Sequence, residues 1–470
     1  MAIDLYLMEA SAPCRAVLMT AKQLGIDLNK KPIDLAKQEQ LKPEFIKMNP
    51  QHTVPTLDDN GYYIWESRAI LTYLANKYAP DNNIYPKDPQ KRGVVDRLLY
   101  FDLGVLYKTL ADYAYPVLFM GKEKDPEKEK AFENSLKFLD GFLEKSTYVA
   151  GDHLTLADLS ILATLTFTEI SDYDLSAHPH LHAWYTKLKS QLPYFKEVNE
   201  PGLRQLKAYI EMRKQEQKKI DTDTRSELFK TKGHSVRSVS YIVYLLKTTL
   251  NMAIDLYLME AIASCRAVLM TAKQLGIDLN KKPIDLTKQE QLKPEFIKMN
   301  PKHTVPTLDD NGYYIWESRA ILTYLANKYA PDNNIYPKDP QKRGVVDRLL
   351  YFDLGVLFKT LADYAKPFLF MGKEKDPEKE KAFENSLKFL DGFLEKSTYV
   401  AGDHLTLADL SILATLTITE VFDYDLSVHP HLHAWYTKLK SQLPYFKEVN
   451  EPGLRQLKAL VEMRKQELKK

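Results

Sequence analysis

One serine lies where a strand is expected to run into a helix. Ser11 follows the alternating apolar residues of 3–7 and precedes Pro13, a residue type favoured in the first turn of a helix. A hydroxyl there can donate a hydrogen bond to a sulfur anion on a ligand, and the positive end of the helix adds to the effect. Lowering the pKa of a free thiol, about 8.5, by about two units requires about 2.7 kcal/mol. The alternative is that Ser11 is only the N-cap of the helix.

The chain contains its own comparison, because residues 1–219 (copy 1) and 252–470 (copy 2) are nearly identical. They differ at about fourteen positions. A repeat of this length is a duplicated protein, since the units of solenoid proteins have only about 20–50 residues. One of the differences is Ile262 in place of Ser11. Isoleucine has no hydrogen-bond donor, so the contact with a sulfur anion is lost in copy 2.

The first part of each copy alternates between strand and helix patterns. In copy 1 strands are expected at 3–7, 32–35, 54–57 and 62–64, and helices at 13–25, 43–48 and from 66 onwards. Asn60-Gly61 is a strong signal for a hairpin between the last two strands. The order βαβαββα is that of a thioredoxin-like domain, which we assign to 1–80 and 252–331. In that fold the position of Ser11 usually carries a cysteine.

The rest of each copy has the pattern of an all-helical domain, at 89–219 and 340–470. Thr155 and Asp158 have the spacing of a capping box, which we expect to be architectural. The predicted fold class is therefore α/β plus all-α, present twice. Residues 220–251 belong to neither copy and are predicted to be a linker, within which 238–250 is an apolar stretch of unassigned role.

Composition limits the kinds of partner and compartment. The formal net charge of +2 argues against nucleic-acid binding, which needs clustered basic residues. The only two cysteines, Cys14 and Cys265, exclude a disulfide scaffold, and we expect Cys14 to be a small buried side chain. The chain has neither a signal-peptide pattern nor an apolar run of ~20 residues. We therefore expect a cytoplasmic protein with no nucleic-acid or membrane partner.

Several motifs resemble those of the cytosolic glutathione transferases, most closely the insect delta class. They recur in both copies, and in copy 1 they are Ser11-Ala-Pro-Cys-Arg15, Asn49-Pro-Gln-His-Thr-Val-Pro55, Trp65-Glu-Ser-Arg-Ala-Ile-Leu71 and Ala150-Gly-Asp-His-Leu-Thr-Leu-Ala-Asp158. The resemblance implies glutathione as co-substrate, with no other cofactor and no metal. It also implies two-fold pairing of helical domains, either within one chain as a pseudo-dimer or between chains as a homodimer.

The resemblance assigns roles to residues of copy 1. Ser11 would donate a hydrogen bond to the glutathione thiolate. Val54, before a cis Pro55, would pair its backbone with the cysteinyl part. Glu66 would hold the ammonium, and Ser67 with its helix N-terminus would hold the γ-glutamyl carboxylate. The remaining contacts would come from His52, at the glycine carboxylate, and Arg68; the corresponding residues of copy 2 are His303, Val305, Pro306, Glu317, Ser318 and Arg319.

These assignments have structural alternatives. Glu66 and Ser67 could simply begin a helix, and Arg68 could belong to a structural ion pair. Two residues depart from the family pattern. The carboxylate of Glu9 would oppose a nearby thiolate unless it points to water, and Gln40 stands where a histidine is common.

A second group of residues would line the pocket for the electrophile. Aromatic side chains with a polar tip suit varied apolar substrates, and Lys366 would make the pocket of copy 2 cationic. The predicted lining residues are Tyr107, Tyr115, Leu118 and Tyr209 in copy 1, and Phe358, Lys366, Leu369 and Leu460 in copy 2.

The sequence therefore predicts a tandem glutathione transferase that conjugates the glutathione thiolate to electrophilic apolar compounds, as in detoxification. Copy 1 is expected to be active. Copy 2 is expected to bind glutathione and to activate it poorly because of Ile262.

Three alternatives remain open at this stage. The protein could bind and carry apolar ligands without turnover, and Ile262 favours this for copy 2. The same thiolate could serve dehydrochlorination or peroxide reduction. Finally, the long chain could result from two adjacent genes joined in error, in which case residues 220–251 are translated spacer.

Overall fold

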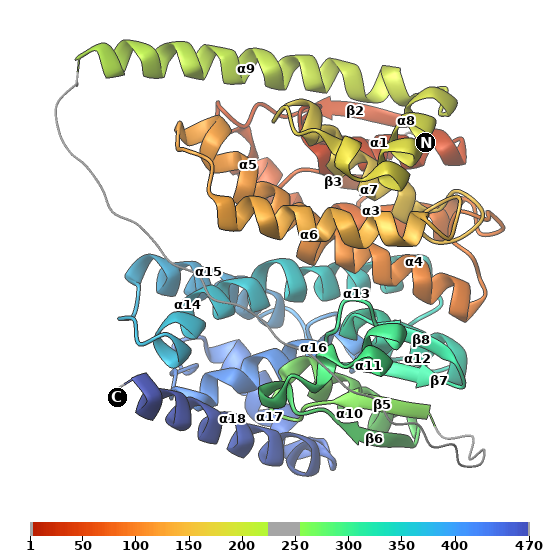
Figure 1. The fold of residues 1–470 in the computed structure, drawn as a ribbon. Coiled ribbons are helices and arrows are strands. Elements are labelled where there is room, and N and C mark those ends of the chain that lie inside the picture. Colours follow the sequence, from red (N-terminus) through yellow and green to blue (C-terminus); the bar gives the residue numbers. More distant parts are fainter. Residues whose placement is uncertain (1–2, 224–253, 469–470) are drawn as a thin grey trace.

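The computed structural model describes residues 3–223 and 254–468, with the side chains of 213–223 left out. The two copies lie one above the other in Figure 1, with the long helices α9 (Phe195–Asp223) and α18 (Phe446–Leu468) on the outer faces. Helix α9 runs four residues past the predicted boundary at 219. The rest of the predicted linker, including the apolar stretch 238–250, lies outside the described residues.

Each copy begins with a four-stranded mixed sheet. In copy 1 the strands are β1 (Ile3–Leu7), β2 (Leu28–Pro32), β3 (Thr56–Asp59) and β4 (Tyr62–Trp65), in the order β2-β1-β3-β4. Strands β1 and β2 are parallel, and the other pairs are antiparallel. Copy 2 repeats the sheet with β5 (Ile254–Leu258), β6 (Leu279–Pro283), β7 (Thr307–Asp310) and β8 (Tyr313–Trp316). The predicted thioredoxin-like topology is confirmed.

Two strand positions differ from the prediction. Strand β2 covers 28–32 instead of 32–35, because it is an edge strand whose middle residues are polar and exposed, so apolar alternation does not mark it. Strand β3 begins at Thr56 instead of Val54, since Pro55 has no N–H to give to the ladder. The hairpin is as predicted, with positive φ at Asn60 (55°) and Gly61 (90°).

Helices cover the sheet and position its loops. In copy 1, α1 (Ala12–Leu24) and α3 (Ser67–Tyr78) pack against each other, and the short helices η1 (Glu39–Leu41) and α2 (Pro43–Met48) lie between β2 and β3. The corresponding helices of copy 2 are α10 (Ala263–Leu275), η5 (Leu286–Lys288), η6 (Glu290–Leu292), α11 (Pro294–Met299) and α12 (Ser318–Tyr329).

The second domain of each copy is helical. In copy 1 it contains α4 (Pro89–Phe101), the π-helical η2 (Asp102–Tyr107), α5 (Lys108–Met120), α6 (Pro126–Leu143), α7 (Leu156–Leu165), η3 (Thr166–Glu169), η4 (Leu175–Ala177), α8 (Pro179–Gln191) and α9. In copy 2 it contains α13 (Pro340–Phe352), the π-helical η7 (Asp353–Leu357), α14 (Phe358–Phe370), α15 (Pro377–Leu394), α16 (Leu407–Leu416), η8 (Thr417–Val421), α17 (Pro430–Gln442) and α18.

The capping box at the start of α7 is confirmed. Asp158 accepts hydrogen bonds from the backbone N–H of Thr155 at 2.8 Å and from its hydroxyl at 2.7 Å. The same carboxylate also accepts from Trp184 Nε1 on α8 at 3.1 Å. Helix α7 is buried along its whole length and packs against α1 of the first domain, so this cap fixes one domain to the other.

The two copies contact each other through α3 and α4 of copy 1 and α13 and α12 of copy 2 (Figure 1). Tyr100 and Tyr351 stack at the centre, with ring centroids 4.4 Å apart. Hydrogen bonds surround them in symmetric pairs. The Tyr62 hydroxyl donates to the backbone oxygen of Gln341 at 2.8 Å, and the equivalent bond joins Tyr313 to Gln90.

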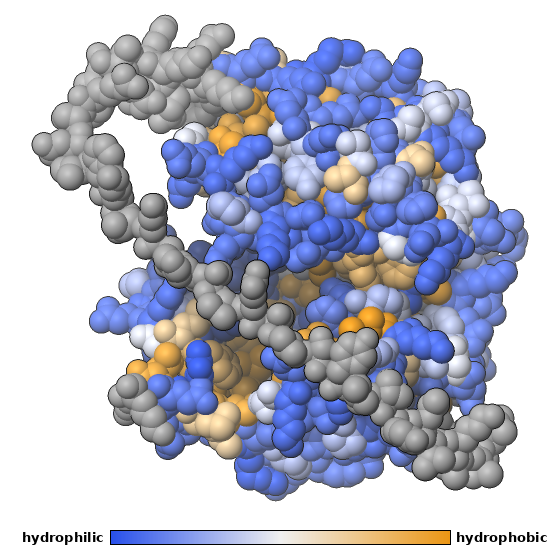
Figure 2. Space-filling view, in the orientation of Figure 1, coloured by the Kyte–Doolittle hydropathy of each residue, from blue (hydrophilic) through white to orange (hydrophobic). Residues whose placement is uncertain are grey.

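Among the described residues, no helix is long and apolar enough to cross a membrane. The face shown in Figure 2 is mostly hydrophilic, and hydrophobic side chains gather where α14 and α18 lie side by side. Two exposed apolar side chains on these segments are Met371, directly after α14, and Met463 on α18.

Candidate active site

Ser11 lies at the N-cap of α1, but its side chain does not cap the helix. The residue has extended backbone angles (φ −77°, ψ 120°), and its N–H donates to the backbone oxygen of Met8 at 2.9 Å. Its side chain lines a cavity of about 700 Å³. The side chain makes no capping hydrogen bond, which goes against the N-cap alternative, and its one hydrogen bond within the described residues is with the Cys14 thiol.

Aromatic side chains form one wall of this Ser11 cavity. Tyr107 and Tyr115 share a hydrogen bond between their hydroxyls at 2.9 Å. The ring of Tyr115 lies 5.3 Å from that of Phe167, and the ring of Phe119 lies 6.3 Å from that of Tyr209. The structure thus brings the predicted thiolate donor and three predicted pocket residues into one cavity.

Leu118 does not belong to this wall, contrary to the prediction. It is buried in the helical core and does not line the cavity. Because α5 presents Tyr115 and Phe119 to the cavity, Leu118 points to a different side of the helix, where it packs inwards.

The loop that carries Ser11 is held from behind by a buried arginine. Arg15 donates to the backbone oxygens of Glu9 (3.0 Å) and Ala10 (2.7 Å), and to Asn199 on α9 at 3.1 Å. Gly202, also on α9, allows close contact, since a Cβ there would lie 2.0 Å from the Glu9 oxygen. Arg15 is therefore a structural residue.

The carboxylate of Glu9 does not turn towards the cavity. It forms a partly exposed ion pair with Lys30 on β2, at 3.1 Å. An acidic residue can therefore occupy this loop, because the Glu9 carboxylate pairs with Lys30 and does not face Ser11.

The predicted glutathione residues lie at the start of β3 and at the start of α3. The peptide bond between Val54 and Pro55 is cis, as predicted. Glu66 precedes α3 with an unusual positive φ of 66°, and Ser67 is the buried first residue of the helix. A non-glycine residue in this backbone region often marks a functional site. Burial raises the pKa of Glu66 to about 7, against the opposing effect of Arg68 and Arg348.

Arg68 is held by a buried carboxylate. Its guanidinium donates to Asp102 through Nε at 3.1 Å and Nη2 at 2.7 Å, and Nη1 lies 3.4 Å from the Ser67 hydroxyl. Ser160 and Thr164 on α7 also donate to Asp102, at 2.6 and 2.9 Å. Arg68 therefore orients Ser67 from behind, and the ion-pair alternative describes its contacts better than direct binding.

The site of copy 1 includes a residue of copy 2. The guanidinium of Arg348 lies 3.8 Å above the ring of Trp65, directly before Glu66, and Arg97 of copy 1 lies in the same way above Trp316. Arg348 opposes the rise in the pKa of Glu66, and Glu317 opposes the fall in the pKa of Arg97, which burial lowers to about 10. His52 is exposed with its ring 6.3 Å from that of Phe389, again on the other copy.

Copy 2 differs most where Ser11 is replaced. Ile262 has nearly the same backbone angles (φ −85°, ψ 119°) and is half-buried. A cavity of about 160 Å³ lies beside it and contains most of the predicted glutathione residues of this copy. These lining residues are Val305, Pro306, Glu317, Ser318 and Arg319, whereas His303 does not line the cavity.

The predicted pocket residues of copy 2 do not meet in one cavity. Phe358 lines the small cavity, and Leu460 lines a separate one of about 540 Å³. Lys366 is exposed and Leu369 is buried, and neither lines these two cavities, contrary to the prediction. Leu369 is buried on the same side of its helix as Leu118. The aromatic wall of copy 1 is not repeated, because Phe358 and Lys366 cannot make the Tyr107–Tyr115 hydrogen bond and Ile418 replaces the ring of Phe167.

Cys14 takes no part in the cavity. It is fully buried, as predicted, and burial raises its pKa to about 11. Ser11 and the Met8 backbone act against this rise without reversing it. A thiol with such a pKa is not a nucleophile near neutral pH.

Comparison with known proteins identifies the fold. The model of the glutathione S-transferase N-terminal domain matches residues 1–76 and 252–327, and that of the C-terminal domain matches 106–191 and 355–442. The chain belongs to the glutathione S-transferase family. It contains the complete domain pair twice, and glutathione transferase activity is the function that this membership supports.

Solved structures of insect glutathione transferases are similar to this transferase over one copy. A delta-class enzyme from Nilaparvata lugens is 51% identical, with 45% of this chain and 99% of that chain covered and a TM-score of 0.44. The Bombyx mori transferase BmGSTD1 is 41% identical over 44% and 98% of the chains, with a TM-score of 0.43. An epsilon-class enzyme from the housefly, Musca domestica, is 40% identical over 45% and 98%, with a TM-score of 0.42.

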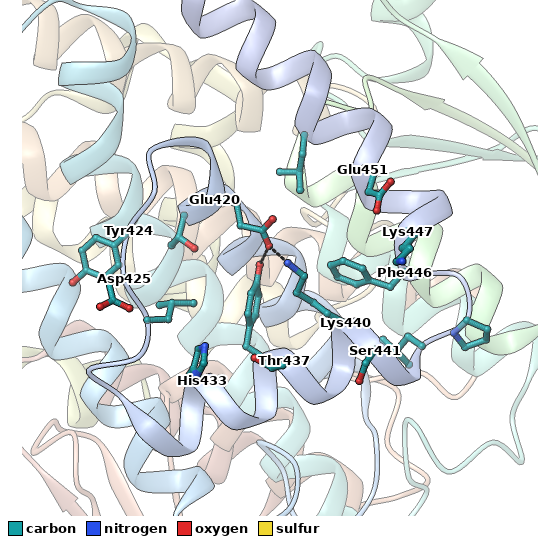
Figure 3. A pocket seen from close by; sticks show the side chains of 16 residues that line it. Glu420, Tyr424, Asp425, His433, Thr437, Lys440, Ser441, Phe446, Lys447 and Glu451 are labelled. Atoms are coloured by element: carbon teal, nitrogen blue, oxygen red, sulfur yellow. Dashed lines mark hydrogen bonds and ion pairs between the residues drawn. The ribbon is translucent and has the colours of Figure 1, made fainter.

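Each copy of the transferase has a further concavity, of about 790 Å³ in copy 1 and 780 Å³ in copy 2. Figure 3 shows the one in copy 2, where Glu420 accepts hydrogen bonds from Tyr436 and from Lys440. Its lining residues are identical in the two copies and include neither Ser11 nor Ile262. This concavity therefore does not explain any difference between the copies.

Sequence reasoning missed several residues of the site, among them Phe119 and Phe167 in the aromatic wall of copy 1 and Lys302 in copy 2. Gln51 is replaced by Lys302 in copy 2, and Lys302 lines the small cavity together with Glu317. The signal was available, because position 51 is among the differences between the copies and stands inside a family motif. The contact itself, between residues on separate segments, becomes visible only in the fold.

Proposed function

We propose that copy 1 conjugates glutathione to electrophilic, largely apolar compounds. The observation that carries the proposal is the position of Ser11, which does not cap its helix and lines a cavity with an aromatic wall. The hydroxyl donates a hydrogen bond to the glutathione sulfur, and the N-terminus of α1 adds a positive potential. Both favour the thiolate over the thiol.

Glutathione binds along the segment from His52 to Arg68. The γ-glutamyl carboxylate accepts from Ser67 and the free N–H groups at the start of α3, and the ammonium pairs with Glu66. The backbone of Val54 pairs with the cysteinyl part, and His52 faces the glycine carboxylate. Arg68, held by Asp102, is a positioning residue for Ser67.

In the reaction the glutathione thiol first loses its proton to solvent. The thiolate then attacks the electrophilic carbon. In a substitution a sulfur–carbon bond forms and the leaving group departs with its electron pair. In an addition to an activated double bond the sulfur–carbon bond forms, the π electrons move to the adjacent carbon, and that carbon takes a proton from solvent. Ser11 gives up no proton and forms no covalent bond. The apolar wall formed by Tyr107, Tyr115 and Tyr209 accommodates the second substrate.

Copy 2 is impaired in this reaction, because Ile262 cannot donate a hydrogen bond. Binding without turnover is therefore a second candidate function, favoured for copy 2 alone. Dehydrochlorination and peroxide reduction would use the same thiolate of copy 1. Assays with an activated aryl chloride, an organochlorine that can lose HCl and an organic peroxide, each with Ser11→Ala as control, separate these activities.

We further propose that the two copies pair within one chain, in the cytoplasm. The symmetric contacts around Tyr100 and Tyr351 support intrachain pairing. Light scattering of the purified protein should give one chain of 54.3 kDa. A mass of two chains would instead support pairing between chains. An immunoblot of tissue distinguishes one long polypeptide from two short ones.

A further inference from the structure

Position 51 of the motif that holds glutathione has changed its chemistry between the copies. In copy 1 the side-chain oxygen of Gln51 accepts a hydrogen bond from Trp65 Nε1, and the residue is buried. In copy 2 the corresponding Lys302 has no acceptor to offer. Trp316 Nε1 is consequently buried without a partner in the part of the chain that the structure describes. The substitution therefore gives up a hydrogen bond.

The new ammonium pairs with the carboxylate that is expected to bind glutathione. Lys302 Nζ lies 2.6 Å from Glu317 Oε1, and the two side chains are only 20% and 17% exposed. The ammonium also lies 5.3 Å above the ring of Phe101, on the other copy. A short, shielded ion pair next to an aromatic face is stronger than one in open solvent. In copy 1, by contrast, the described residues offer Glu66 no ion-pair partner.

The subsite of copy 2 therefore no longer attracts a ligand ammonium as the subsite of copy 1 does. A free ligand ammonium can neutralise Glu66, whereas Glu317 is already neutralised by a cation of the protein. Ser318 and the N-terminus of α12 remain at the same cavity, together with Lys302 itself. These groups favour a carboxylate and disfavour a neighbouring ammonium.

We propose that Lys302 occupies the place of the glutathione ammonium in copy 2, so that this site selects ligands that carry the terminal carboxylate but lack the α-ammonium. The inference rests on the proposed function, in which Glu66 and Glu317 are the ammonium-binding residues. It revises the sequence-based expectation that copy 2 binds glutathione as copy 1 does. Copy 2 differs in what it binds as well as in how it activates a thiol.

The expected discrimination follows from one charge-assisted contact. Such a contact contributes about 1.5–3 kcal/mol, which corresponds to a difference of about tenfold to a hundredfold in affinity. Glutathione should bind copy 2 more weakly than copy 1 by this factor. A des-amino analogue, with a glutaryl group in place of γ-glutamyl, should show the opposite preference.

Calorimetric titration of the full chain tests the proposal. The probes are S-hexylglutathione and its des-amino counterpart, whose alkylated sulfur makes binding independent of thiolate activation. The wild-type chain should bind one S-hexylglutathione tightly, and Lys302→Gln should create a second site of similar affinity. The matched change Gln51→Lys should weaken the tight site by about tenfold or more.

A second variant separates charge from hydrogen bonding. Lys302→Met removes the ammonium without restoring the acceptor for Trp316, so a gain of S-hexylglutathione binding in this variant as well assigns the effect to the charge. Two equal sites in the wild-type chain, or no effect of Gln51→Lys, would overturn the inference alone. No binding of S-hexylglutathione in any variant would overturn it together with the proposed function.

Discussion

Replacing Ser11 by alanine tests the central contact of the proposed mechanism. A hydrogen bond to a charged group contributes about 1.5–3 kcal/mol, and one pKa unit corresponds to about 1.4 kcal/mol. The pKa of bound glutathione should therefore rise by about one to two units in Ser11→Ala. The N-terminus of α1 remains in place, so part of the original lowering should persist.

The structure also predicts what this change leaves alone. Because the Ser11 side chain makes no capping hydrogen bond and only a weak one with the Cys14 thiol, its removal should change the free energy of unfolding by less than about 0.5 kcal/mol. Binding of S-hexylglutathione should likewise be unchanged. A loss of activity can then be assigned to the thiolate and not to folding or binding.

The assay is the pH dependence of conjugation with an activated aryl chloride, together with ultraviolet titration of the bound thiolate. Below the pKa of bound glutathione, the rate of Ser11→Ala should fall about tenfold to a hundredfold. Unchanged turnover and an unchanged titration curve would refute the mechanism. Copy 1 would then be a binding protein for apolar compounds or would activate the thiol by the helix alone.

Copy 2 offers the reciprocal experiment. The backbone at Ile262 already has the angles of Ser11, so Ile262→Ser places a hydroxyl without rearrangement. Because Lys302 occupies Glu317, we expect this single change to add little activity in a Ser11→Ala background. Ile262→Ser with Lys302→Gln should restore conjugation, and equal rates for the single and double variants would contradict the proposed role of Lys302.

Three further predictions follow from packing and from titration. Gly202→Ala should cost about 1–3 kcal/mol of unfolding free energy and lower conjugation, because its Cβ would meet the Glu9 oxygen at 2.0 Å. Thermal unfolding measures the loss of stability, and turnover measures the loss of activity. A variant as stable and active as wild type would show that the loop carrying Glu9 can move aside. Glu66, with a pKa raised to about 7 by burial, must be ionised to pair with an ammonium. Binding of S-methylglutathione should therefore release protons near pH 7, and its affinity should fall about tenfold for each pH unit below 7. Calorimetry in buffers of different ionisation enthalpy measures this proton release, which should be absent in Glu66→Gln. Burial also raises the pKa of Asp96 to about 6 and raises that of Asp347 at the interface between the copies. The folded chain then holds more protons than the unfolded chain between about pH 4 and 6. The unfolding free energy contributed by Asp96 should therefore fall by up to about 3 kcal/mol as pH rises through this range. Denaturant titrations should show that the unfolding free energy of Asp96→Asn depends less on pH than that of the wild type, and an identical pH dependence would count against the burial argument.

Local patterns were sufficient for most of the fold. The hairpin at Asn60-Gly61 and the capping box of Thr155 depend on residues close in sequence, so the sequence predicted them correctly. Strand β2 was misplaced because its polar residues are stabilised by pairing with β1, a non-local interaction that leaves no apolar alternation. The same limit explains Leu118, since only the packing of α5 decides which side of the helix faces the cavity.

The amino-acid sequence by itself determined that this chain is a doubled glutathione transferase. It also determined that copy 2 lacks the hydrogen-bond donor that Ser11 provides in copy 1. Those conclusions depend on residue identity at known spacing. The tertiary structure decided which side chains meet: Arg15 behind the loop of Ser11, Arg348 above Trp65, and Lys302 on Glu317. Such contacts join segments that are far apart along the chain or lie on different copies, and their charges act over distances that only the folded molecule defines.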